Sequence, residues 1–174
     1  MILVTGGSSG LGKAIAEEIR KKGERVLTLS RNKIDGDINH IQCDITDYES
    51  LKSIYLDLLN TKQKISALIN CAGIASMNLA ITTPPSVTEK IVKTNLIGTI
   101  FSNQIFAPLL IKNNGGRIIN FSTIAVHLGL KGESIYVASK AGVEGFSRVL
   151  AKELSNFNIT VNCIAPGPIR TNLL

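Results

Sequence analysis

The sequence predicts a doubly wound α/β protein, a three-layer α/β/α arrangement in which one parallel sheet lies between helices. Short apolar runs alternate with longer stretches of helical periodicity along the 174 residues. The apolar runs are nearly continuous, as expected for strands that are buried on both faces. Each candidate motif follows an apolar run directly, which gathers the motifs at the carboxyl edge of the sheet, where such folds bind ligands.

Six strands and four long helices account for this pattern. The strands are expected at Ile2–Thr5, Val26–Leu29, His40–Cys43, Ile65–Asn70, Arg117–Phe121 and Ile159–Ile164. The helices are expected from the glycine-rich turn to Gly23, from a Thr46–Glu49 capping box to about Lys62, from a Ser86–Glu89 capping box through a bend near Pro108, and over Ser134–Leu154. No repeat or linker interrupts the alternation, so residues 1–174 are expected to form a single domain.

Composition predicts a globular cytoplasmic protein. Hydrophobic residues make up 44% of the chain and charged residues 18%. We find no apolar run near the roughly 20 residues that span a bilayer, and the first residues enter a strand rather than resembling a signal peptide. The three cysteines, Cys43, Cys71 and Cys163, are far apart and lack metal-ligand spacing, which indicates reduced thiols and no metal site.

The charge balance favours a small anionic ligand. Nineteen Lys and Arg against thirteen Asp and Glu give a net charge of +6, which by itself also suits nucleic acid. The basic residues are scattered, however, and only Arg20–Lys22 form a run, at a helix end that favours cations. With no Trp and 5% aromatic residues there is little for bases to stack on, so we expect no nucleic-acid partner.

A glycine-rich turn follows the first strand. Gly6, Gly10 and Gly12 stand between that strand and a helical stretch, with Ser8 and Ser9 among them. Glycines let the backbone approach a pyrophosphate, which the free N–H groups of the helix's first turn then bind. The spacing differs from the commoner GxGxxG pattern, but its position between strand and helix predicts phosphate binding.

The end of the second strand indicates which dinucleotide binds. Proteins that use NAD usually place an acid there for the ribose hydroxyls, whereas this chain has Arg31 after Ser30. An arginine pairs with the 2′-phosphate of NADP through a charge-assisted fork. The sequence therefore favours NADP(H), the alternative being that Arg31 is a solvated turn residue.

Tyr136 and Lys140 lie four residues apart on the last predicted helix and so share one face. An ammonium beside a phenol favours the phenolate, so we expect the pKa of Tyr136 to fall below its ordinary value of about 10. The pair would then donate and accept a proton. The alternative is two surface residues that share a helix by accident.

Two further polar residues, Asn95 and Asp44, each have two possible interpretations. Asn95 interrupts an apolar helix face, where it either caps a local irregularity or holds a water. Asp44 ends the third strand, where it either hydrogen-bonds an adenine edge or assists the turn. His40 is alone and is interpreted as structural.

Taken together, these motifs resemble the short-chain dehydrogenase/reductase family, whose members have a Rossmann fold, and the resemblance runs from Ile2 to Thr171. The matching motifs are TGGSSGLG at Thr5–Gly12, Asp44–Ile45, NCAG at Asn70–Gly73, Asn95, YVASK at Tyr136–Lys140 and PGPIRT at Pro166–Thr171. The resemblance implies that Tyr136 is the catalytic acid/base, that Lys140 lowers its pKa and binds the nicotinamide ribose, and that Asn95 holds a relay water. It implies that the cofactor contacts Gly6, Ser8, Ser9, Gly10, Leu11, Gly12, Arg31, Asp44, Ile45, Asn70, Cys71, Ala72, Gly73, Tyr136, Lys140, Pro166, Gly167, Ile169 and Thr171.

The chain also departs from the family pattern. Thr123 stands where a serine usually orients the substrate carbonyl, with Ser122 just before it, and Cys71 replaces an asparagine. Two arginines of carrier-protein-dependent relatives correspond to Asn114 and Phe157, which disfavours a carrier-protein substrate. The resemblance further implies that the usual last strand and substrate lid are missing, which leaves an open pocket and the sixth strand at the sheet edge.

The expected function is NADP(H)-dependent reduction of a ketone, or oxidation of the matching secondary alcohol. The alternative is a non-catalytic NADP-binding or scaffold protein without a lid. The family's usual dimer contact uses helices that correspond to Asn95–Leu110 and Tyr136–Leu154, so the resemblance implies a homodimer.

Overall fold

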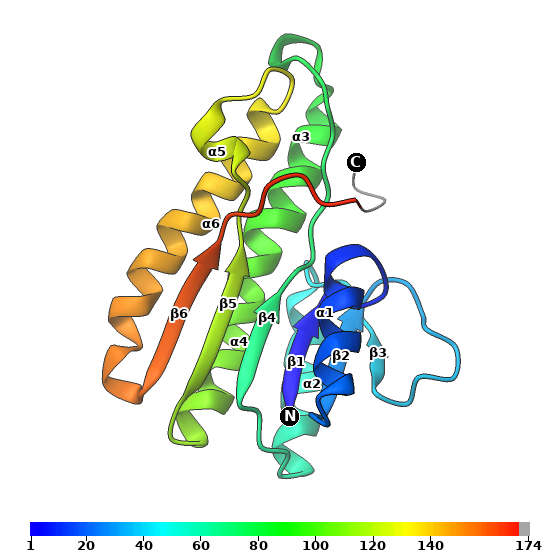
Figure 1. Ribbon diagram of the computed structural model, residues 1–174, viewed down its shortest axis with the longest axis vertical. Coiled ribbons are helices and arrows are strands. Elements are labelled where there is room, and N and C mark those ends of the chain that lie inside the picture. Colours follow the sequence, from blue (N-terminus) through cyan, green and yellow to red (C-terminus); the bar gives the residue numbers. More distant parts are fainter. Residues whose placement is uncertain (171–174) are drawn as a thin grey trace.

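The computed structural model describes residues 1–170 and contains one parallel sheet of six strands in the order β3-β2-β1-β4-β5-β6 (Figure 1). The strands are β1 (Ile2–Thr5), β2 (Val26–Ser30), β3 (His40–Gln42), β4 (Ala67–Asn70), β5 (Gly116–Phe121) and β6 (Ile159–Ile164). The strand order reverses between β1 and β4, and this switch point is where open α/β sheets bind ligands. The predicted fold class is confirmed, and β6 is an edge of the sheet within residues 1–170.

Helices cover both faces of the sheet. They are α1 (Gly10–Lys21), α2 (Tyr48–Asn60), α3 (Pro85–Val92), α4 (Gly98–Lys112), α5 (Ala125–Leu128) and α6 (Ser134–Glu153), with a π-helical turn η2 (Lys93–Ile97) and 3-10 turns at Ala80–Thr82 and Ser155–Phe157. Helix α1 packs on β1 and β2 from one side, while α4 and α6 pack on the sheet from the other and α2 packs beside α4 (Figure 1).

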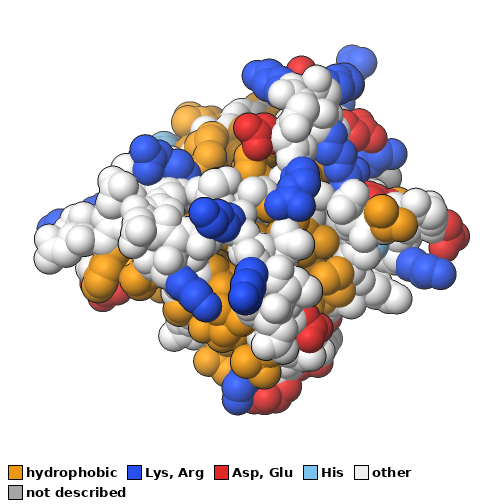
Figure 2. Space-filling view, turned by 90° about the horizontal axis from the view of Figure 1, so that it is seen from below, with side chains coloured by type: hydrophobic (Ala, Val, Ile, Leu, Met, Phe, Trp, Pro, Cys, Tyr) orange, Lys and Arg blue, Asp and Glu red, His pale blue; other side chains and the backbone are white. Residues whose placement is uncertain are grey.

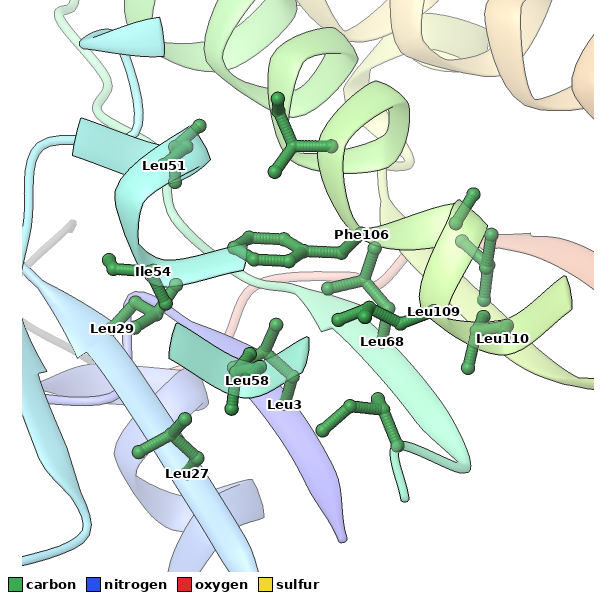
Figure 3. Close-up of a cluster of buried hydrophobic side chains, with 14 of the residues drawn as sticks. Leu3, Leu27, Leu29, Leu51, Ile54, Leu58, Leu68, Phe106, Leu109 and Leu110 are labelled. Atoms are coloured by element: carbon green, nitrogen blue, oxygen red, sulfur yellow. The ribbon is translucent and has the colours of Figure 1, made fainter. Parts of the chain in front are cut away.

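The larger hydrophobic core lies between the sheet and the α2/α4/α6 layer. Phe106 of α4 is fully buried and extends toward α2 and the leucines of the central strands (Figure 3). A smaller cluster under α1 joins Val4, Ala16, Val26 and Ile69. These contacts fix the ends of β1, β2, β4 and β5, from which the site is built.

Two helix starts differ from the predicted capping boxes. Helix α2 is capped by Asp47 rather than Thr46, because the Asp47 carboxylate accepts the Ser50 N–H at 3.1 Å. Helix α3 has no side-chain cap; Pro84 precedes it and Pro85 stands in its first turn, where a missing N–H costs nothing.

Residues 85–112 form one continuous helical stretch of 28 residues that is long and apolar enough to cross a membrane by length and composition alone. More than half of its most apolar part, 56%, is buried inside the protein, as in a core helix. Pro108 lies inside α4, and the bend expected near it stays a prediction. An irregularity that was not predicted is the π-turn at 93–97, which contains Asn95.

Charged side chains are spread over the surface. On the face at the amino ends of the strands, Lys and Arg are separated by hydrophobic and uncharged atoms (Figure 2). Most ion pairs among the described residues are solvent-exposed, such as Lys13 with Glu17 at 3.8 Å, and contribute little stability. The more buried pair of Arg20 and Asp37, at 2.9 Å, joins α1 to the β2–β3 connection.

Candidate nucleotide-binding and active site

A cleft of about 570 Å³ opens at the carboxyl ends of the strands. Its volume lies in the range typical of cofactor sites. The predicted site residues that line it are Gly6, Ser8, Ser9, Gly10, Leu11, Gly12, Arg31, Asp44, Ile45, Cys71, Ala72, Gly73, Thr123, Tyr136, Lys140, Pro166, Gly167 and Ile169. Asn70 and Asn95 are buried outside this lining, and Thr171 lies outside the described residues.

The glycine-rich turn is shaped by close backbone contacts. Gly6 has φ +73°, and a Cβ there would lie 2.8 Å from the Ala72 backbone. A Cβ on Gly12 would lie 2.3 Å from the Gly6 carbonyl oxygen. Ser9 makes no side-chain cap, and the first turn of α1 carries no acid, so the positive end of the helix is available to an anion.

We expect Gly12→Ala to abolish nucleotide binding and to lower the free energy of unfolding by about 1–3 kcal/mol, because the new methyl group overlaps backbone rather than a movable side chain. Urea denaturation and nucleotide titration measure the two effects. Gly145→Ala is a suitable control, since a Cβ at Gly145 meets nothing within 4 Å. An unchanged affinity in Gly12→Ala would contradict this role of the turn.

Arg31 and Asp44 follow the neighbouring strands β2 and β3, and both line the cleft. Arg31 is exposed and its carbonyl accepts from Gln42 Nε2 at 2.8 Å. Asp44 Oδ1 accepts the Thr46 N–H at 2.9 Å. Asp44 therefore assists the turn, as one of its two interpretations predicted, while still lining the cleft.

Tyr136 and Thr123 both line the cleft. The Thr123 side chain lowers the pKa of Tyr136, but burial of the phenol has the larger effect, so the pKa lies above its ordinary value. The prediction of a lowered tyrosine pKa is therefore wrong for the protein without a ligand. The physical reason is that desolvation of the phenolate outweighs its favourable contacts.

Lys140 follows Tyr136 by one turn of α6, and its ammonium reaches the end of β5. Its side chain is buried, with 6% exposure, and its ammonium donates to the Phe121 carbonyl at 2.8 Å. Burial lowers the pKa of Lys140 to about 8. Gly73 borders this group, since a Cβ there would lie 3.5 Å from Lys140 Nζ, an ordinary van der Waals distance.

The fully buried Asn95 side chain joins two segments of the site. Oδ1 accepts the Ile74 N–H at 2.8 Å, while Nδ2 donates to the Ile74 carbonyl at 2.9 Å and to Ser139 Oγ at 3.1 Å. Asn95 does stand in a local irregularity, the π-turn, but its side chain binds Ile74 and Ser139 rather than the backbone of that turn. Through Ser139, which donates to the Tyr136 carbonyl at 2.7 Å, it also fixes the start of α6.

Thr123 and Ser122 have separate partners. The Ser122 hydroxyl donates to the Glu144 carboxylate, which also lies 3.7 Å from His127 Nε2. Of the two hydroxyl groups, only that of Thr123 affects the pKa of Tyr136. This arrangement favours Thr123 as the group that meets a substrate carbonyl.

A buried polar network lies beneath the cleft and was not expected from the sequence. Asn70 and Asn120 are opposite each other on β4 and β5, and Asn70 Nδ2 donates to Asn120 Oδ1 at 2.8 Å. Ser102 of α4 donates to Asn70 Oδ1 at 2.7 Å, and Asn120 Nδ2 donates to Ser147 of α6 at 2.8 Å. Both polar atoms of the Asn70 side chain therefore have partners within the core, and the predicted cofactor contact of Asn70 stays a prediction. The sequence contains one signal for this network, which is a polar residue at the matching position of each of two neighbouring strands, Asn70 and Asn120.

The cleft lies at the switch point of the sheet, and the glycine-rich turn borders it. Tyr136, Thr123 and the buried Lys140 line the same cleft. Together these features define a nucleotide-dependent oxidoreductase of Rossmann type. The family model for short chain dehydrogenase matches residues 1–174. The chain belongs to this family and is therefore an NAD(P)-dependent dehydrogenase or reductase.

Individual relatives agree with this assignment. The chain is 36% identical over 179 residues to carbonyl reductase family member 4 of Xenopus laevis, covering 98% of this chain and 75% of that protein. It is 32% identical to the human 3-oxoacyl-[acyl-carrier-protein] reductase, covering 98% of this chain and 76% of that protein. It is also similar to the solved structure of Thermoplasma acidophilum aldohexose dehydrogenase, with 29% identity, a TM-score of 0.93, and coverage of 99% of this chain and 68% of that one.

Proposed function

We propose that the protein is an NADP(H)-dependent carbonyl reductase that converts a ketone into a secondary alcohol. The observation that carries the proposal is that Tyr136, Thr123 and the buried Lys140 line one cleft, with the Lys140 ammonium donating to the Phe121 carbonyl at 2.8 Å. Tyr136 would donate a proton to the carbonyl oxygen of the substrate, and Thr123 would donate a hydrogen bond to the same oxygen. Lys140 is a cation that stabilises negative charge nearby.

The residues present fit a nicotinamide dinucleotide. The turn at 6–12 would hold the pyrophosphate on backbone N–H groups, and Arg31 would pair with the 2′-phosphate. Lys140 has donors beyond the one given to Phe121 and would bind the nicotinamide ribose. When bound, the reduced cofactor supplies a hydride, and the protein supplies orientation and protons.

The protonation state of the site favours reduction. Because the pKa of Tyr136 lies above its ordinary value, the phenol is neutral at pH 7 and carries the proton that a reduced carbonyl needs. Thr123 donates to the same oxygen and thereby polarises the carbonyl. Tyr136 then passes its proton to that oxygen as negative charge develops on it.

The entrance to the cleft indicates an apolar substrate body. Met77, Leu130 and Ile169 line the cleft and are 74%, 45% and 37% exposed. Exposed apolar side chains around a polar catalytic pair are typical of a site that buries part of a hydrophobic ligand. We infer a ketone attached to an apolar chain or ring.

We expect Arg31→Ala to weaken NADPH binding by about ten- to a hundredfold and to leave NADH binding within threefold of wild type, because only NADPH carries the 2′-phosphate. Fluorescence titration with both nucleotides measures this, and a panel of apolar ketones then tests turnover. Lys33→Ala, at an exposed lysine near the same loop, controls for general loss of charge. Equal losses for both nucleotides would contradict the assignment of Arg31.

A second candidate is a non-catalytic NADP-binding or scaffold protein. NADPH binding without turnover of any carbonyl in the panel would favour it.

We also propose that residues 1–174 act as one nucleotide-binding domain, that the protein is a homodimer through α4 and α6, and that it is cytoplasmic. Three free cysteines are consistent with a reducing compartment.

A further inference from the structure

The short strand β3 contacts the loop that carries Arg31. Gln42 Nε2 donates to the Arg31 carbonyl at 2.8 Å, and His40 Nε2 lies 2.9 Å from the Asn32 carbonyl oxygen. His40 and Gln42 are two residues apart, so they lie on the same side of the strand. Two consecutive carbonyl groups of the loop are therefore bound by side chains from the neighbouring strand.

The partners of the His40 ring determine where its proton lies. A carbonyl oxygen only accepts, so Nε2 carries the hydrogen that is donated to Asn32. Nδ1 then accepts from Thr28 Oγ1 at 2.8 Å. The Ser30 hydroxyl also donates to the Asn32 carbonyl, at 2.8 Å. The ring is thus fixed at both nitrogens, between the middle of β2 and the loop after it.

The backbone of His40 is anchored in turn. Its N–H donates to the Asp37 carbonyl at 3.1 Å, and the Asp37 carboxylate pairs with Arg20 at 2.9 Å. Arg20 stands in the last turn of α1, the helix that begins at the glycine-rich turn. The loop position is therefore tied to the same helix that would bind the pyrophosphate.

Neither His40 nor Gln42 lines the cleft, whereas Ser30, Arg31 and Asn32 do. We propose that His40 and Gln42 are positioning residues that fix the backbone of Arg31 and Asn32 and so set the preference for a 2′-phosphorylated adenosine ribose. The inference rests on the proposed NADP(H) function. An exposed arginine loses side-chain and backbone freedom when it binds a phosphate, and a backbone fixed beforehand reduces that loss.

Binding measurements test the proposal without a known substrate. We expect Gln42→Ala and His40→Phe each to raise the dissociation constant of NADPH about three- to tenfold in fluorescence titrations, as the loss of one or two hydrogen bonds implies, and to leave that of NADH unchanged. His40→Gln, whose amide can donate to the Asn32 carbonyl, should restore at least part of the NADPH affinity. Gln63→Ala is the matched control, because it removes an amide bound to Arg25 in the α2–β4 connection, outside the cleft.

A double-mutant cycle separates positioning from general stability. In an Arg31→Ala background, Gln42→Ala and His40→Phe should cause no further loss of NADPH affinity, since they act through Arg31. A further loss there, or an equal loss for NADH in the single variants, would overturn the proposal. If the wild type prefers NADPH but the single variants bind it equally well, only the positioning role is overturned. If the wild type prefers NADH, both the positioning role and the proposed NADP(H) function are overturned. Thermal melting of each variant verifies that it is folded.

Discussion

Tyr136→Phe is expected to bind NADPH with wild-type affinity and to lose turnover by a factor of about 10³, within the range for removing a general acid. The substitution deletes only the phenolic oxygen, and the half-buried ring keeps its place on α6. Without that oxygen, the variant has no acid beside Thr123 that could protonate the carbonyl oxygen of the substrate. Steady-state turnover of an apolar ketone and an NADPH titration measure the two quantities.

The matched control is Tyr48→Phe, at an exposed tyrosine whose ring packs edge-on against Phe101 away from the cleft. It should keep both turnover and NADPH affinity. If purified Tyr136→Phe retained more than a tenth of wild-type turnover, the assignment of Tyr136 as the acid would be wrong.

Lys140→Met is expected to lose turnover by at least about a hundredfold and to change how stability depends on pH. The pKa of Lys140 is about 8 in the folded protein, compared with 10.5 for an unperturbed lysine. Between these values the unfolded chain binds more protons than the folded one, so the Lys140 contribution to stability rises with pH across this window. Below about pH 8 the buried ammonium carries its full desolvation cost.

The difference in unfolding free energy, wild type minus Lys140→Met, should therefore rise by about 3 kcal/mol from pH 7.5 to pH 10.5. Burial raises the pKa of Cys43 to about 11 and of Cys71 to about 12, so both thiols oppose this trend. The Cys43 contribution cancels in the difference, whereas for Cys71 only the effect of burial cancels, because the Lys140 ammonium also lowers its pKa. Urea denaturation at several pH values measures the difference, and Lys152→Met, at an exposed lysine in the last turn of α6, is the control. Parallel pH profiles of the unfolding free energy for wild type and Lys140→Met would contradict a lowered pKa for the buried Lys140.

The strands and the clustering of the site were predictable because they depend on local pattern. Ile2–Thr5 and Ile159–Ile164 have the predicted bounds, since each is a short run rich in apolar residues with glycine or proline close to its ends. Motifs after parallel strands gather at one edge whatever their separation in sequence. The sequence therefore placed Arg31, Thr123 and Tyr136 in one cleft correctly.

What could not be predicted depends on partners distant in the chain. Asn95 binds Ile74 and Ser139, which are 21 and 44 residues away, and no local signal reveals the π-turn that brings them together. The pKa of Tyr136 depends on how deeply neighbouring segments bury the phenol, and a helix spacing of four residues does not contain that information. Asn70 and Asn120 look like surface amides individually, and only their register on adjacent strands makes them a buried pair.

The π-turn at 93–97 also indicates which changes of chain length this helix tolerates. A wide turn holds one residue more than an α-helical turn would over about the same rotation, and each residue of an α-helix advances its face by about 100°. Deleting one residue there would close the wide turn into regular α-helix, so α3 and α4 would keep their relative rotation and Phe106 its place in the core. The residues of the turn itself would shift, and Asn95 would lose its bonds to Ile74. A single-residue deletion within α4 would instead rotate the two parts of the helix against each other by about 100°.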